Sequence, residues 1–212
     1  YDNYRTLSSK WGRITAMNEI GGTLKVLFER KEASIYIGAN NLKQTQQGGQ
    51  EILVSSDDVL GSVNESETSF GTISPESVIV VNRHLFFFDQ NSGCIVRDAA
   101  NGPVDISSPY KIRTFTNRIV PFLNRAVYKR VVSGYNPKYN EVWFTFYTES
   151  PHNVQLSETI VFDADDQGSG FMFVDLADAD RKSADAYCSL KNDMYSFRGA
   201  QLYKHDEGEY RE

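Results

Sequence analysis

The sequence has few cysteines and no long apolar run. Cys94 and Cys188 are the two cysteines among 212 residues, and neither belongs to a CxxC pair. Two cysteines do not form a disulfide framework, and their strand-like apolar surroundings predict buried, unreactive thiols. No window approaches the roughly 20 apolar residues that a transmembrane helix needs, so we expect no membrane insertion.

Motifs of catalysis and cofactor binding are also missing. There is no GxSxG nucleophile elbow, no phosphate-binding glycine-rich loop, no HExxH and no Cys/His zinc pattern. His84, His152 and His205 lie in or beside predicted turns, without the spacing of metal ligands. We therefore expect no enzyme activity and no cofactor or metal. The net charge of −6 disfavours a general binder of nucleic acid or anionic membranes.

Aromatic residues, in contrast, are abundant, with 13 Phe, 12 Tyr and 2 Trp. Such residues suit a pleated, half-buried surface, and they recur here in short runs separated by Asn/Gly turns. The clearest example has four short runs, at residues 78–81, 85–88, 94–97 and 104–106. This pattern predicts an all-β fold of antiparallel four-stranded blade modules of the β-propeller type.

The runs group into four modules at roughly constant spacing. Equivalent positions at Leu24, Leu85, Val142 and Tyr195 are separated by 61, 57 and 53 residues, as expected for stacked units. We predict one propeller-like region over residues 1–212, with the excess length in loops at 39–72 and 108–130. The chain starts without Met and its last module is short, so we expect a segment of a longer or processed protein. An irregular β-sandwich is the alternative. The predicted modules span residues 13–55, 70–108, 130–176 and 184–212.

Residues 109–129 depart from the strand pattern. Apolar residues spaced by three and four predict a short helix that crosses between modules, or two turns, since Pro121 would interrupt or start a helix. No acidic residue lies between Asp105 and Glu141, although basic residues are frequent there. They form a face that docks on an acidic partner or lines a path for nucleic acid, or they are the solvated side of a helix. The predicted contact residues are Arg113, Arg118, Arg125, Lys129 and Arg130.

Two further groups of residues have predicted roles. Residues 163–170 (DADDQGSG) could hold calcium but lack the EF-hand spacing, and we interpret them as a plain turn. The acidic residues Asp175, Asp178 and Asp180 are interpreted as an exposed loop. The predicted core anchors are Phe86, Phe88, Trp143, Phe144, Phe146 and Phe162.

Residues 71–78 (GTISPESV), followed by 82–88 (NRHLFFF), 93–96 (GCIV) and 135–144 (YNPKYNEVWF), carry a family resemblance. Their order resembles blades of the tail hub, stabilisation or muzzle proteins of short-tailed phages, including crAss-like phages. The resemblance implies a structural protein of the virion tail, formed in the host cytoplasm and assembled as a cyclic ring with other tail proteins. It would close the DNA channel and meet nucleic acid only indirectly. The alternative is a carbohydrate-binding or glycan-degrading propeller that acts on a host surface polysaccharide.

Overall fold

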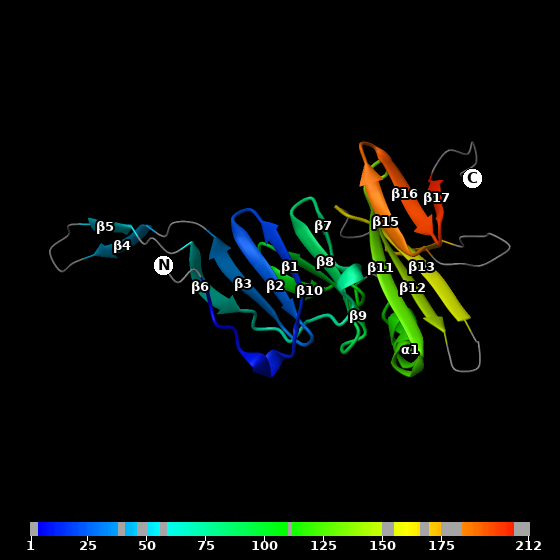
Figure 1. Ribbon diagram of the computed structural model, residues 1–212, viewed down its shortest axis with the longest axis horizontal. Helices are drawn as coiled ribbons and strands as arrows, with labels where there is room; N and C mark the ends of the chain where they lie inside the picture. The colour runs from blue at the N-terminus through cyan, green and yellow to red at the C-terminus, as the bar shows by residue number, and fades with distance from the viewer. Residues whose placement is uncertain are drawn as a thin grey trace. The chain divides into compact units, whose positions relative to one another are not determined.

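Short antiparallel strands dominate the computed structural model (Figure 1). The structure describes residues 4–37, 41–45, 51–55, 59–109, 112–149, 155–165, 170–174 and 184–205. Within them lie four antiparallel sheets of three or four strands, one two-stranded hairpin and one α-helix. The predicted all-β character is confirmed. The contacts divide the chain into two compact units, Tyr1–Gly71 and Thr72–Glu212, where the sequence pattern predicted one region.

The first unit contains one four-stranded sheet and the hairpin. The sheet has the strand order β1-β2-β3-β6, and the short helix η1 (Ser9–Trp11) precedes it. The first module does not end at residue 55, because the fourth strand of its sheet lies beyond that position. The sequence of this fourth strand, LGSVNE, has few residues that favour strands. It becomes a strand because it pairs with β3, which is distant in the sequence. The strands are β1 (Ile14–Ile20), β2 (Thr23–Phe28), β3 (Glu32–Ile37), β4 (Asn41–Thr45), β5 (Glu51–Ser55) and β6 (Leu60–Glu65).

The second unit contains three sheets and the helix. The second sheet has the order β10-β9-β8-β7, the third β11-β12-β13-β14 and the last β15-β16-β17. The elements are η2 (Pro75–Ser77), β7 (Ile79–Val81), β8 (His84–Asp89), β9 (Cys94–Ala99), β10 (Gly102–Asp105), α1 (Arg113–Arg125), β11 (Tyr128–Asn136), β12 (Glu141–Glu149), β13 (Gln155–Asp163), β14 (Met172–Val174), β15 (Ala186–Leu190), β16 (Asp193–Arg198) and β17 (Gln201–Lys204). No helix in the described residues is both long and apolar enough to span a membrane.

The second and third sheets and α1 share one apolar core, which we call the aromatic seam. Its members include Phe86 and Phe88 of β8 and Phe144, Phe146 and Phe162 of the third sheet. The rings of Phe88 and Phe146 meet edge to face with centroids 5.0 Å apart. Such aromatic pairs add stability beyond the area they bury. All six predicted core anchors are buried.

The third and last sheets meet in a second cluster, the mixed seam. Alternation along β12 sends Trp143 to the face opposite its Phe neighbours, where it packs with Val161, Met194 and Tyr187. Gly134 makes this approach possible, because a Cβ there would lie 2.6 Å from the Cβ of Tyr187 and 2.7 Å from the Cε of Met194. The third sheet is therefore packed on both faces. The last sheet is packed on the face that carries Tyr187 and Met194.

Candidate interaction surface around helix α1

Helix α1 lies within the predicted crossing segment and presents one apolar face to the aromatic seam. Phe115, Ile119 and Leu123, spaced by four residues, are buried there. Pro121 neither ends nor starts the helix: it lies inside it, at an exposed position. The structure therefore corrects the interruption predicted at Pro121. The burial of the apolar face offsets the backbone hydrogen bond that the proline removes.

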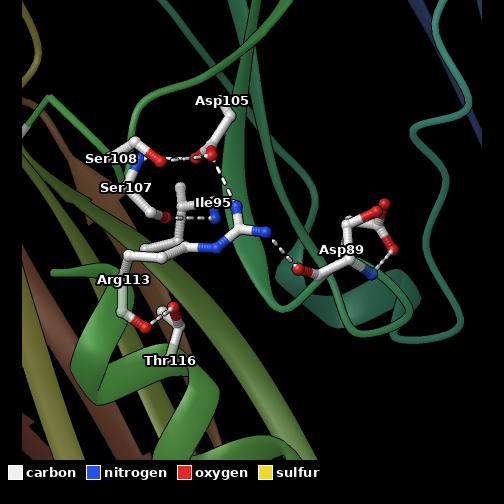
Figure 2. A network of polar contacts seen from close by, with 8 residues as sticks. Asp89, Ile95, Asp105, Ser107, Ser108, Arg113 and Thr116 are labelled. Atoms are coloured by element: carbon white, nitrogen blue, oxygen red, sulfur yellow. Dashed lines mark hydrogen bonds and ion pairs between the residues drawn. The ribbon is translucent and has the colours of Figure 1, made fainter.

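Arg113 starts α1 and holds it to the second sheet (Figure 2). Its Nη1 donates to Oδ2 of Asp105 at 2.5 Å, and its Nη2 donates to the carbonyl oxygen of Ser92 at 2.8 Å. The Asp105 carboxylate also accepts hydrogen bonds from the backbone N–H of Ser107 at 2.7 Å and the hydroxyl of Ser108 at 2.9 Å. Charge-assisted bonds of this kind are among the stronger hydrogen bonds. Arg113, a predicted contact residue, is thus engaged in an internal tie.

Cys94 lies at the start of β9, close to this tie, and is buried. Burial, with the nearby carboxylates of Asp105 and Asp89, raises the pKa of its thiol to about 12. The thiol therefore stays protonated and unreactive at neutral pH, as the sequence predicts. Cys188 on β15 is exposed, so the prediction of two buried thiols is wrong for this residue. It lies on the face of β15 opposite Tyr187 because strand residues alternate.

Arg130 makes a second internal tie, across the mixed seam. Its Nη1 donates to Oδ1 of Asp185 at 2.6 Å, and its guanidinium also donates to the hydroxyl of Tyr128. The backbone N–H of Gly199 donates to the other carboxylate oxygen of Asp185 at 2.5 Å. Burial works against ionisation of Asp185, but these hydrogen bonds outweigh it and lower its pKa. Arg130 therefore connects β11 to the last sheet.

The other three predicted contact residues are exposed. Arg118 lies 3.9 Å from Oε1 of Glu158, and its guanidinium is 5.5 Å from the ring centroid of Phe115. Arg125 occupies the last turn of α1, where a cation interacts favourably with the helix dipole. Lys129, like Arg125, has no ion-pair partner among the described residues. Of the five predicted contact residues, the exposed cations are thus Arg118, Arg125 and Lys129.

A cavity of about 550 Å³ opens between α1 and β14. The ring of Phe173 meets that of Phe115 at 5.0 Å between centroids, nearly perpendicular, and Phe171 packs on Phe162 at 4.8 Å. No sequence pattern marks this site, because its walls come from segments 40 or more residues apart. Its lining residues are Ile112, Thr114, Phe115, Arg118, Glu158, Phe171 and Phe173.

An asparagine network, also missed from the sequence, joins the second and third sheets. The Asn82 side-chain amide donates to Asn140 Oδ1 at 3.1 Å and to Asp165 Oδ1 at 3.0 Å. The Asn140 amide donates to Asp163 Oδ1 at 3.1 Å and to Asp165 Oδ2 at 2.8 Å. Both asparagines have a positive φ, 49° and 56°, which Asn tolerates better than most residues. The signal available in the sequence was an asparagine in the hairpin turn of two successive modules.

Two members of this network, Asp163 and Asp165, begin residues 163–170, the acidic turn considered above as a possible calcium site. The backbone N–H of Asp165 donates to Asp163 Oδ1 at 2.9 Å, the geometry of a local turn. Burial and the charges of Asp165 and Asp163 raise the pKa of the Tyr135 hydroxyl, which donates to Asn140 at 2.9 Å. Within the described part of the chain, no three His, Cys, Asp or Glu residues are grouped to hold a metal ion. Residues 166–169, His152, Asp175, Asp178 and Asp180 lie outside the described residues.

Comparisons with known proteins identify no family for the chain. No protein-family model matches it, and no match is found among the curated proteins.

Proposed function

We propose that this chain is a structural component of a phage tail, a hub or muzzle at its distal end, built from propeller-type blades. One observation carries the proposal: three successive small sheets pack face to face through apolar clusters, and the Arg130–Asp185 ion pair links the third sheet to the last one. Such an arrangement provides rigid stacking rather than a reaction centre. The resemblance of residues 71–78 and 135–144 to tail-protein blades supports the choice of tail.

In this proposal the chain has no enzymatic role and works through contacts with other tail proteins in a cyclic assembly that closes the DNA channel. The exposed cations Arg118, Arg125 and Lys129 supply a docking point for an acidic surface of a neighbouring tail protein. Exposed charges steer association and set partner choice more than they add affinity. Contact with nucleic acid is indirect, through the channel.

The direct test is the composition of purified virions. We expect the chain in virion tails by mass spectrometry, with antibody labelling at the distal end in electron micrographs. Absence from purified, infectious particles would contradict the proposal. A triple substitution, R118E with R125E and K129E, is expected to lower incorporation into tails while the chain stays folded. Arg83→Glu, a charge reversal at an exposed turn, is the matched control and should incorporate normally.

A second candidate function, the recognition of a host surface polysaccharide, is favoured by the cavity between α1 and β14. Aromatic rings with charged groups at the rim are suited to binding the faces and hydroxyl groups of sugars. In this alternative Phe173 would stack on a sugar ring and Arg118 and Glu158 would contact hydroxyls. Binding to a glycan array that is lost in a Phe173→Ala variant would establish this function. It would do so with or without turnover of capsular polysaccharide. Lack of both binding and turnover would leave the structural role.

A further inference from the structure

Two lysines lie over the ring of Trp11, the one tryptophan of the first unit. The ammonium of Lys10 is 4.2 Å from the ring centroid, and the ammonium of Lys31 is 4.4 Å from it. The ring quadrupole attracts both cations, but this attraction leaves their charges unneutralised. We call these three side chains the lysine–tryptophan site.

Lys31 is the unusual member of the site, because it is buried without a counter-charge. The residue is 8% exposed, and its ammonium has no hydrogen-bond or ion-pair partner among the described residues. Lysine is rarely buried to this degree unless a charge partner accompanies it. Lys25 of the same unit follows that rule, since it pairs with buried Glu32 at 3.0 Å. The Lys31 ammonium is therefore able to take an anionic partner from outside the chain.

The indole N–H of Trp11 is a second donor without a partner at the same place. Its Nε1 atom is buried and has no hydrogen-bond acceptor among the described residues. Trp143, the other tryptophan of the chain, donates its indole N–H to Oε2 of Glu141 at 3.2 Å. Buried polar groups are normally satisfied, and each exception calls for an explanation such as a bound ion. The site thus combines a cation and a neutral donor that both lack an acceptor.

The backbone around the site is fixed by the fold. Trp11 ends η1, and its carbonyl oxygen accepts a hydrogen bond from the backbone N–H of Arg30 at 3.2 Å, which joins it to the turn that carries Lys31. Gly12, with a φ of 88°, permits this approach, because a Cβ there would lie 2.5 Å from Oε2 of Glu29. The Trp11 ring is therefore held beside Lys31 in advance, and a ligand does not have to order the backbone.

The charges of the site select a ligand with one negative charge. Lys10 is exposed and lies 3.7 Å from Oε2 of Glu65, so its charge is already partly balanced. The charge that has no partner is that of Lys31. A carboxylate supplies one negative charge and two acceptor oxygens, which suits one ammonium and one indole N–H. We propose that the lysine–tryptophan site binds a carboxylate group, either of a free organic acid or of an acidic side chain in a partner protein.

Carboxylate binding at this site does not depend on the proposed tail function. All of its groups belong to the first unit, whereas the cations assigned to tail contacts, such as Arg118, belong to the second. A chain that binds no carboxylate could still be found in virion tails. A chain absent from virions could still bind carboxylates, so the two failures are distinguishable.

The test follows the two indole N–H signals in a nitrogen–proton NMR spectrum of the isotope-labelled chain. Trp11 and Trp143 are the two tryptophans, so the spectrum of Trp143→Phe assigns both signals. During titration with sodium acetate at constant ionic strength, the Trp11 signal should shift and saturate, because its N–H gains an acceptor. The Trp143 signal is the internal reference and should not move, since its donor is already bound to Glu141. No saturable shift at Trp11, or equal shifts of both signals, would overturn the site.

Charge-removing variants test whether Lys31 holds the ligand. Lys31→Met keeps an apolar stem, and it should weaken acetate binding roughly tenfold or more because a hydrogen bond to a charged group is lost. Lys10→Met should weaken binding less, because Lys10 is exposed and already paired with Glu65. Arg30→Met removes the same charge from the exposed neighbour of Lys31 and should bind acetate like the wild type. Equal losses in Lys31→Met and Arg30→Met would show an effect of overall charge and overturn the site. The wild-type titration stands even if Lys31→Met does not fold.

Two further titrations identify the source and the class of the ligand. A short glutamate peptide with blocked ends that binds more tightly than acetate would indicate an acidic side chain of a partner protein. Equal affinities for the peptide and acetate would indicate a free organic acid. Inorganic phosphate at the same ionic strength should bind more weakly than acetate. Tighter binding of phosphate would overturn the assignment to a carboxylate.

Discussion

The two seams of the second unit attach sheets by different means. At the aromatic seam, rings from β8, β12, β13 and α1 interdigitate in one continuous apolar cluster. At the mixed seam the buried apolar cluster of the described residues consists of Trp143, Val161 and Met194, and hydroxyl groups and an ion pair supplement them. The Thr145 and Tyr187 hydroxyls, for example, are 2.5 Å apart. Apolar burial is the larger stabilising term per residue. The last sheet should therefore separate more easily than the second and third sheets separate from each other.

Phe144→Ala should break the aromatic seam and give the largest effect. Phe144 is fully buried and stacks on Phe162 with centroids 6.2 Å apart. Removing such a ring leaves a cavity and costs about 3–5 kcal/mol of unfolding free energy. Phe122→Ala, at a half-exposed position of α1, is the matched control and should cost much less. Urea unfolding followed by tryptophan fluorescence measures both, and equal losses would contradict the packing described.

Gly134→Ala should weaken the mixed seam selectively. The added methyl would overlap Tyr187 and Met194, and overpacking of this kind costs roughly 1–3 kcal/mol. Hydrogen exchange should show lost protection in β15–β17, while β8 and β12 keep theirs. Ser133→Ala changes the neighbouring residue of the same strand and removes only a long 3.3 Å hydrogen bond to the carbonyl of Glu76. It should leave the exchange of the last sheet unchanged.

Asn140→Ala should loosen the polar edge of the aromatic seam. The substitution removes the side-chain hydrogen bonds to Asp163, Asp165, Asn82 and Tyr135. It also leaves alanine, which has a Cβ but no such hydrogen bonds, at a φ of 56°. We expect a loss of about 1–2 kcal/mol in the free energy of unfolding. Asn140→Gly removes the same bonds but tolerates the backbone conformation, so the difference between the two variants isolates the backbone cost. An unchanged unfolding midpoint in both would exclude a stabilising role.

Asp185→Asn should have the smallest effect and a characteristic pH dependence. The pKa of Asp185 is lower in the folded chain, so its ionised form stabilises the fold above the unfolded pKa of about 3.9. That contribution is lost as the pH falls through the lower, folded pKa. For a partly exposed pair we expect about 0.2–1 kcal/mol at neutral pH. The denaturation midpoints of wild type and variant should differ at neutral pH and converge in strong acid.

The control for this pH dependence is Asp193→Asn. It removes the same charge, but the Asp193 partner, Lys204, lies in the same sheet at 3.2 Å, so no tie across the seam is lost. Hydrogen exchange of the last sheet should respond to Asp185→Asn and not to Asp193→Asn. An equal response would show that the Arg130 tie has no special role in holding the last sheet.

Helix α1 shows how far the sequence could predict the candidate site. The spacing of apolar residues, Phe115, Ile119, Phe122 and Leu123 among them, predicted a short helix or two turns, because helical periodicity is a local property. The helix forms, but Phe122 is half-exposed, so the spacing predicted its buried face only in part. The same reasoning treated Arg113 and Arg130 as contact residues like Arg118. It could not distinguish them, because the partners of the first two, Asp105 and Asp185, lie 8 and 55 residues away and are brought close by the fold. Exposure of a charged residue depends on such tertiary pairing.

By itself, then, the sequence determined the antiparallel strands, their Asn and Gly turns and the buried aromatic anchors. Each of these depends on alternation or turn chemistry within a few residues. Only the tertiary structure decided which basic residues stay exposed, that Leu60–Glu65 completes the first sheet, and that Cys188 lies on an open face. These features depend on which surfaces meet, and short-range patterns do not encode that choice.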